Sequence, residues 1–159
     1  MQVPNANVRS PTYYVARTSK PCPHCGQLNR LVALALPPNH ETLDPDATAD
    51  GAWQAVHAHA LLFYVTELPE AAQRHLYQLA PLFRIVRGAG ALNGHWANHC
   101  GHCGSAIDDH DLHCEPGVFM PHDDAEAANI QLLPIGEAFE AAAAGYALEP
   151  EFFRFMRRF

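Results

Sequence analysis

Two short stretches, Cys22-Pro23-His24-Cys25-Gly26 and Cys100-Gly101-His102-Cys103-Gly104, share the pattern C-x-x-C-G. Two thiolates separated by two residues grip one metal ion when the backbone between them folds into a tight knuckle. The residue after the second cysteine then tends to need a positive φ, which glycine adopts without steric cost. Gly26 and Gly104 occupy that position in the two motifs. The repeated pattern therefore predicts two metal-binding knuckles.

The two knuckles together supply four thiolates, from Cys22, Cys25, Cys100 and Cys103. Four thiolates form the closed tetrahedral set of a structural Zn²⁺ site and leave no position for a substrate. The two motifs are separated by 74 residues, far more than the roughly 15–20 of a compact site. Zinc binding in such sites contributes about 10–16 kcal/mol, whereas the cost of closing a loop rises only logarithmically with its length. We therefore expect one Zn²⁺ to join two distant parts of the chain.

The bulk properties are those of a globular protein. The chain has 159 residues, a formal net charge of −7 and 48% hydrophobic residues, which predicts a single domain over residues 1–159. The first ten residues contain no basic segment followed by an apolar run, so we expect no signal peptide. No apolar stretch approaches the roughly 20 residues of a membrane span. We therefore predict a cytoplasmic protein, in which thiols stay reduced.

Both knuckles are expected at the tips of β-hairpins. The segment Thr12–Thr18 is β-branched and aromatic, and therefore typical of a strand. Leu28–Leu36 fits either a helical face or a strand, and we favour the strand because it would pair with Thr12–Thr18. His95–His99 is expected as a short strand before the second knuckle, with its return strand within residues 105–114.

The remaining segments predict a mixture of strands and helices. Asn39–Gly51 is acidic and rich in turn residues, which predicts a loop. We further expect a buried strand over Ala60–Val65, a helix over Glu70–Leu79, a short helix within Asp123–Asn129, and an alanine-rich helix over Glu137–Ala144 that Gly145 ends. The tail, residues 152–159, mixes aromatic residues with arginine and is expected to dock on the body of the protein.

These features resemble a zinc ribbon, in which two β-hairpins with C-x-x-C-G turns meet at one metal ion. The first knuckle has the Cys-Pro-x-Cys-Gly form that is common in that family. The chain also resembles small uncharacterised bacterial proteins with a split ribbon, a resemblance that implies no activity. The resemblance to a zinc ribbon implies an α+β fold with ribbon halves at residues 12–36 and 95–114. Residues 39–94 would then form an inserted strand–helix unit, and residues 120–159 a C-terminal helical extension.

The sequence favours a non-enzymatic function. A closed zinc site offers no open coordination position, and we find no carboxylate cluster, Ser/His/Asp set or phosphate-binding glycine loop. We therefore expect a zinc-stabilised interaction module that binds a protein partner. The net negative charge disfavours a nucleic-acid partner, because phosphate contacts require an excess of lysine and arginine. A local basic patch around the first knuckle stays open, from Arg9, Arg17, Lys20 and Arg30.

The alternative function is thiol–disulfide oxidoreduction. Cys100-Gly101-His102-Cys103 matches the active-site tetrapeptide of protein disulfide isomerase, and Cys22-Pro23-His24-Cys25 matches that of a periplasmic disulfide oxidase of the thioredoxin family. A histidine between the cysteines helps to stabilise a thiolate. A thioredoxin-like nucleophile, however, lies at a helix N-terminus, and Gly104–Asp109 is a poor helix former. The first motif suits this alternative better, because a helix over Leu28–Leu36 would satisfy that requirement.

Other side chains near the motifs are weaker candidates as metal ligands. Cys114 is a fifth thiol, which we expect to be a small buried apolar residue. The histidines of and beside the motifs are expected to be exposed residues that offset the negative charge of the site, namely His24, His99 and His102. His57 and His59 would share one face of a strand, and we expect them to be solvated or packed in the core.

Overall fold

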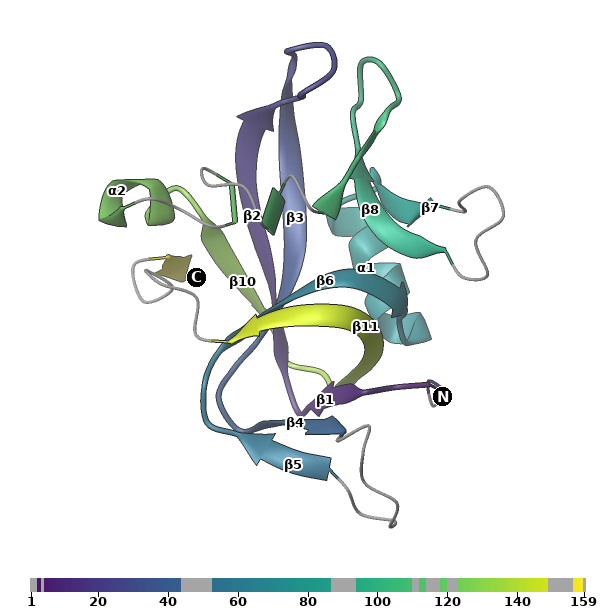
Figure 1. Ribbon diagram of the computed structural model, residues 1–159, viewed down its shortest axis with the longest axis vertical. Coiled ribbons are helices and arrows are strands. Elements are labelled where there is room, and N and C mark those ends of the chain that lie inside the picture. The colour runs from purple at the N-terminus through teal and green to yellow at the C-terminus, as the bar shows by residue number, and fades with distance from the viewer. Residues whose placement is uncertain are drawn as a thin grey trace.

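The computed structural model describes residues 3, 5–43, 53–86, 94–109, 112–113, 118–119, 123–148 and 156–158. In this part of the chain, twelve strands accompany two helices (Figure 1). The strands are β1 (Val8–Ser10), β2 (Tyr13–Pro21), β3 (Leu28–Leu36), β4 (His40–Leu43), β5 (Trp53–Val56), β6 (Ala60–Glu67), β7 (Phe83–Val86), β8 (His95–His99), β9 (Ala106–Ile107), β10 (Gln131–Ile135), β11 (Phe139–Leu148) and β12 (Arg157–Arg158). The helices are α1 (Glu70–Leu79) and α2 (Asp124–Ala127).

The strands form one continuous network of pairings. Their order is β12-β10-β2-β3-β6-β11-β1-β4-β5, and β8 joins this path at β6 while also pairing with β7 and β9. Every pair is antiparallel except β10 and β12. Because β6 pairs with β3, β11 and β8, it connects the two parts of the chain that carry the knuckles.

The expected α+β fold, a discontinuous zinc ribbon with additions, is wrong. The hairpin of β2 and β3 is not half of a separate ribbon, because β10 and β6 continue the sheet on its two sides. Residues 39–94 do not form an inserted unit either, since β6 lies between β3 and β11. Hydrogen bonds between strands far apart in the sequence decide this arrangement, and no local pattern reports them.

The predicted C-terminal helices are also mostly wrong. In place of the alanine-rich helix over Glu137–Ala144, the chain forms β11, which pairs with both β1 and β6. Alanine favours helices. In β11, however, Phe139, Ala141 and Ala143 are buried at every second position, which is the spacing of one face of a strand. Gly145 ends no helix: a Cβ there would lie 2.2 Å from a ring carbon of Phe63. Tertiary packing therefore overrides the local helix propensity.

Several local predictions are confirmed. The hairpin of β2 and β3 carries the first knuckle, the helix spans Glu70–Leu79 as expected, β6 includes Ala60–Val65, and α2 lies within Asp123–Asn129. The expected loop over Asn39–Gly51 is wrong at His40–Leu43, which is β4. Residues 44–51 of that loop, and residues 152–155 and 159 of the tail, lie outside the described residues. Of the expected return strand in residues 105–114, the structure shows Ala106–Ile107 as β9.

Two apolar clusters cover opposite faces of the central strands. β3 is buried on both faces, because Val32 and Leu34 belong to one cluster while Leu31 and Ala33 belong to the other. Helix α1 covers the first cluster through its buried residues Ala72 and Leu76. Within the described residues, no helix has the length and apolar character that a membrane crossing requires.

A buried carboxyl group lies just beyond the second hairpin. Asp109 is 4% exposed and accepts a hydrogen bond of 2.7 Å from the backbone N–H of Tyr64. Tyr64 has a φ of 51°, and its hydroxyl donates to Asp108 at 2.7 Å. Burial raises the pKa of Asp109 from 3.8 to about 6, although the Tyr64 N–H and the nearby His95 act in the opposite direction. The folded protein therefore binds this proton more tightly than the unfolded chain does.

This pKa shift predicts the effect of replacing Asp109 with asparagine. The contribution of Asp109 to stability is fully present below pH 3.8 and falls as the pH rises through about 6. Asp109→Asn keeps an acceptor for Tyr64 and removes the buried charge, so it should raise the free energy of unfolding at pH 7.5 by about 1–3 kcal/mol. The gain should be roughly half as large at pH 5. Urea unfolding at both pH values measures it.

Asp124→Asn is the control, because it removes the same charge from an exposed residue of helix α2, away from Asp109. It should change stability by less than about 0.5 kcal/mol. Equal destabilisation by Asp109→Asn at both pH values would show instead that the folded protein favours the ionised carboxylate.

Candidate metal centre

The two knuckles have the same backbone geometry. In the first, the Cys22 N–H donates to Gln27 O at 2.8 Å and the Gly26 N–H donates to Cys22 O at 2.9 Å. In the second, the Cys100 N–H donates to Ser105 O at 2.9 Å and the Gly104 N–H donates to Cys100 O at 3.0 Å. Both glycines have a φ of 77°, which confirms the predicted left-handed conformation. The shared sequence pattern therefore encodes one turn twice.

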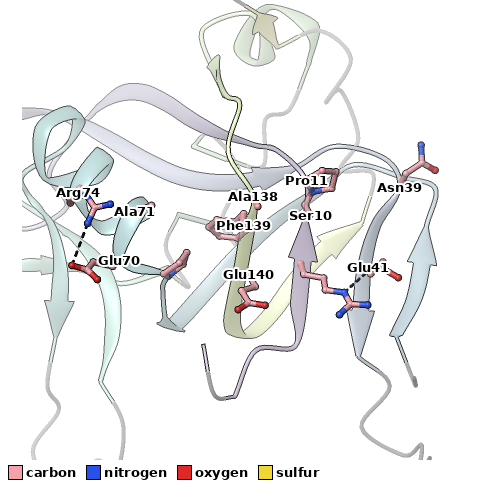
Figure 2. Close-up of a pocket in the computed structure, with 12 residues that line it drawn as sticks. Ser10, Pro11, Asn39, Glu41, Glu70, Ala71, Arg74, Ala138, Phe139 and Glu140 are labelled. Atoms are coloured by element: carbon pink, nitrogen blue, oxygen red, sulfur yellow. Dashed lines mark hydrogen bonds and ion pairs between the residues drawn. The ribbon is translucent and has the colours of Figure 1, made fainter. Parts of the chain in front are cut away.

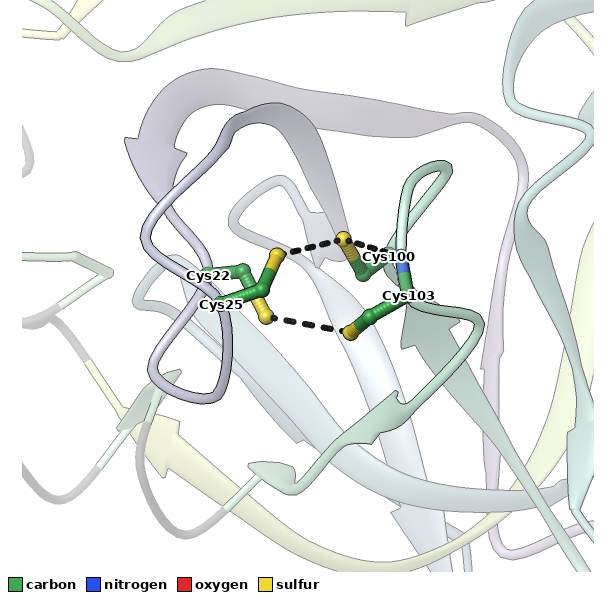
Figure 3. Close-up of side chains that lie close together, drawn as sticks. All are labelled: Cys22, Cys25, Cys100 and Cys103. Atoms are coloured by element: carbon green, nitrogen blue, oxygen red, sulfur yellow. Dashed lines mark hydrogen bonds between the residues drawn. The ribbon is translucent and has the colours of Figure 1, made fainter.

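The structure brings the four cysteines of the two knuckles together (Figure 3). Their four Sγ atoms all lie within 4.8 Å of one another. The distance from Cys22 to Cys103 is 3.8 Å, and that from Cys25 to Cys100 is 3.6 Å. A tetrahedral Zn²⁺ site with Zn–S bonds of about 2.3 Å has S···S edges of roughly 3.8 Å, whereas a disulfide bond is about 2.05 Å long. The cluster is therefore compatible with a bound metal ion.

Each knuckle contributes one buried and one exposed thiol. Cys22 and Cys100 are buried, while Cys25 and Cys103 are exposed. Each buried sulfur accepts a backbone hydrogen bond of 3.3 Å, from His24 in the first knuckle and from His102 in the second. Both N–H groups thus point at sulfur atoms, which a metal-bound cysteine can use as hydrogen-bond acceptors.

Of the two buried thiols, Cys100 has the more polar surroundings. Backbone hydrogen bonds from Cys103 and His102, together with the side-chain amide of Asn29, lower its pKa from 9.0 to about 5 against the opposing effect of burial. Hydrogen bonds from Ser105 also lower the pKa of Cys103. These hydrogen bonds favour the thiolate forms of Cys100 and Cys103, the forms that a metal ion binds.

Two buried asparagines connect the hairpins, and sequence reasoning missed both. Asn29 on β3 donates from Nδ2 to Cys100 Sγ at 3.2 Å and accepts the Gly101 N–H at 3.0 Å. Asn98 on β8 accepts the Val32 N–H and donates to Val32 O, both at 2.9 Å. Asn98 therefore pairs with β3 as a neighbouring strand would. The available signal was an amide side chain inside each of two otherwise strand-like segments.

Among the described residues, the weaker ligand candidates do not belong to the group of four thiols. His24 and His102 are exposed, and their backbone N–H groups contact the site. His99 directs Nδ1 toward the backbone oxygens of Leu82 and Ala97, at 3.1 and 3.0 Å. Cys114 lies outside the described residues. His57 Nδ1 lies 2.7 Å from Asn39 Oδ1.

A hollow of about 590 Å³ lies between helix α1 and strands β1, β4 and β11 (Figure 2). Both of its arginines are paired with a carboxylate: Arg9 contacts Glu41 at 2.8 Å, and Arg74 contacts Glu70 at 3.3 Å. The Arg9 guanidinium also lies 4.2 Å from the centre of the Trp53 ring. Among the described residues that line this hollow, each arginine is paired with a carboxylate, so neither is an uncompensated cation for a ligand.

Comparisons with protein-family models, curated proteins and solved structures found no match for this chain. The chemical interpretation of the site is therefore based on its geometry. Among the described residues, the four cysteines form the one group of histidine, cysteine or acidic side chains close enough to hold a metal ion.

The position of Asn29 predicts an effect on metal affinity. Asn29→Asp keeps the acceptor for Gly101 but replaces the N–H donor to Cys100 with a negative oxygen. Because groups that orient metal ligands typically contribute about 10–100-fold in affinity, zinc binding should weaken by that factor. Competition with a chromophoric zinc chelator measures the change.

Gln27→Glu is the matched control, since it introduces the same charge at an exposed side chain two residues away. Its affinity for zinc should fall by less than about threefold, a difference of well under 1 kcal/mol. Equal losses in the two variants would assign the effect to net charge alone and would remove the positioning role of Asn29.

Proposed function

We propose that this protein is a zinc-stabilised interaction module that binds a protein partner and has no catalytic activity of its own. The observation that supports this most directly is the convergence of four thiols from two separate hairpins. Four cysteine ligands are a common set for structural Zn²⁺, and soft thiolates favour zinc over magnesium or calcium. They would fill the tetrahedral coordination of the ion, so no position is available for a catalytic water or a substrate.

The knuckles also present a surface that suits a protein partner. Both hairpin tips lie at the same end of the molecule in Figure 1. The residues between the two cysteines of each motif are exposed, and Leu28, just past the first knuckle, is 64% exposed. An exposed leucine beside the knuckle would contribute apolar burial to a protein contact. The metal would hold this surface in one shape.

Thiol–disulfide oxidoreduction is the second candidate, and the low pKa of Cys100 favours it. A thiolate of this kind is a good attacking or leaving group. The surroundings argue against it, because each C-x-x-C motif lies between two antiparallel strands, β2 and β3 or β8 and β9. Neither motif begins a helix, so the helix dipole that activates thioredoxin-like nucleophiles is missing at both described motifs.

Substitution of Leu28 tests the proposed partner surface. Leu28→Ser removes the exposed apolar anchor, and Leu43→Ser makes the same change on β4, at the opposite end of the molecule. Affinity capture from an extract of the producing cells, followed by quantitative mass spectrometry, compares the two variants with the unmodified protein. A specific partner should be retained by Leu43→Ser and depleted at least about tenfold by Leu28→Ser, because burying a leucine side chain contributes about 1.5–3 kcal/mol.

Two results would contradict the proposal. The same set of captured proteins with Leu28→Ser and Leu43→Ser would show that the knuckle end is not the partner surface. Catalytic turnover of insulin disulfides by the zinc-loaded protein would favour the oxidoreductase.

A further inference from the structure

A second hollow lies beside the first knuckle and differs in charge from the one in Figure 2. Its volume is about 320 Å³. Three cations line it, Arg17, Lys20 and Arg30, with the polar side chains of Ser19, Asn129 and Gln131 between them. No carboxylate belongs to its lining in the described part of the chain. This concentration of positive charge occurs on a protein whose formal net charge is −7.

The sheet register explains how the hollow forms. β2 pairs with β3 as far as Pro21 and Leu28, whereas its pairing with β10 ends at Arg17 and Gln131. The hairpin therefore extends beyond the start of β10, and the hollow occupies the angle between them. Side chains at paired positions of neighbouring strands point to the same face. This rule places Arg30 beside its partner Ser19, on the face of Arg17. Lys20 lies on the opposite face, so the hollow lies at the edge of the sheet and is lined from both faces.

Two of the three cations, Arg17 and Lys20, are half-buried. The Arg17 Nε donates to Gln131 Oε1 at 3.1 Å, which orients the guanidinium group. Lys20 lies two residues before the ligand candidate Cys22. Arg30 is exposed and also lines the hollow. Three cations of one hairpin thus line one small concavity.

The lining selects an anion with several oxygen atoms. Guanidinium groups bind phosphate through pairs of parallel hydrogen bonds, and lysine adds a compact charge. Hydroxyl and amide side chains supply further hydrogen-bond donors. The volume lies at the lower end of the range for small-molecule sites, about 300–1,000 Å³. We propose that this hollow binds the phosphoryl group of a small phosphate ester.

This proposal does not rest on the proposed protein partner, because it uses other residues and another surface property. It also differs from binding of a nucleic-acid polymer, which needs a longer basic track and releases many counterions. A single phosphoryl site involves few phosphate contacts. Its salt dependence should therefore be shallow, with a slope near that of one or two neutralised phosphates.

Calorimetric titration of the zinc-loaded protein with inorganic pyrophosphate tests the site. We expect one pyrophosphate bound per chain at low salt. The double variant Lys20→Gln/Arg30→Gln should weaken binding by at least about tenfold, since each charge-assisted hydrogen bond contributes on that scale. Arg84→Gln removes an exposed arginine on β7, outside the hollow, and should leave the affinity unchanged.

Three results would overturn the proposal. The first is the lack of saturable pyrophosphate binding at low salt by protein with full zinc content. The second is an equal loss in Arg84→Gln, which would assign the binding to overall charge. The third is much tighter binding of a single-stranded oligonucleotide than of pyrophosphate, with a steep salt dependence, which would make the surface a polymer track. Zinc content and thermal unfolding of each variant verify that it is folded.

Discussion

The structure depends on the meeting of four thiols that are distant in sequence. Cys22 and Cys25 come from the hairpin of β2 and β3, and Cys100 and Cys103 come from that of β8 and β9. Thiolates at 3.6 and 3.8 Å would repel one another strongly. A divalent metal ion at their centre would convert that repulsion into a crosslink. Hydrogen bonds of Asn29 and Asn98 also join the two hairpins, and these bonds do not need the metal.

The rest of the sheet holds the two knuckles at one end of the molecule. β6 pairs with β3 and β8, so it fixes the separation of the two hairpins. Apolar side chains bury both faces of β3, and helix α1 covers one of these faces. The same C-x-x-C pattern serves redox catalysis in proteins where it begins a helix. Here each copy is a turn between antiparallel strands, which favours a structural role.

Local signals predicted the parts of this protein that depend on few residues. The glycine at position five of each motif predicted the knuckle turn, and the segment Glu70–Leu79 predicted helix α1. The path of the sheet was not predictable in this way, because β11 becomes a strand only when β1 and β6 lie on its two sides. Asn29 and Asn98 were missed for the same reason, since their partners lie 71 and 66 residues away.

X-ray absorption at the zinc K-edge, on protein whose metal content has been quantified, tests the central claim most directly. The claim is that the two knuckles close one four-thiolate site around a zinc ion. It predicts one zinc per chain, surrounded by four sulfur atoms at about 2.3 Å and by no nitrogen or oxygen ligand. A chain that takes up no zinc, or a zinc ion with an oxygen or nitrogen ligand in place of a thiolate, would contradict it.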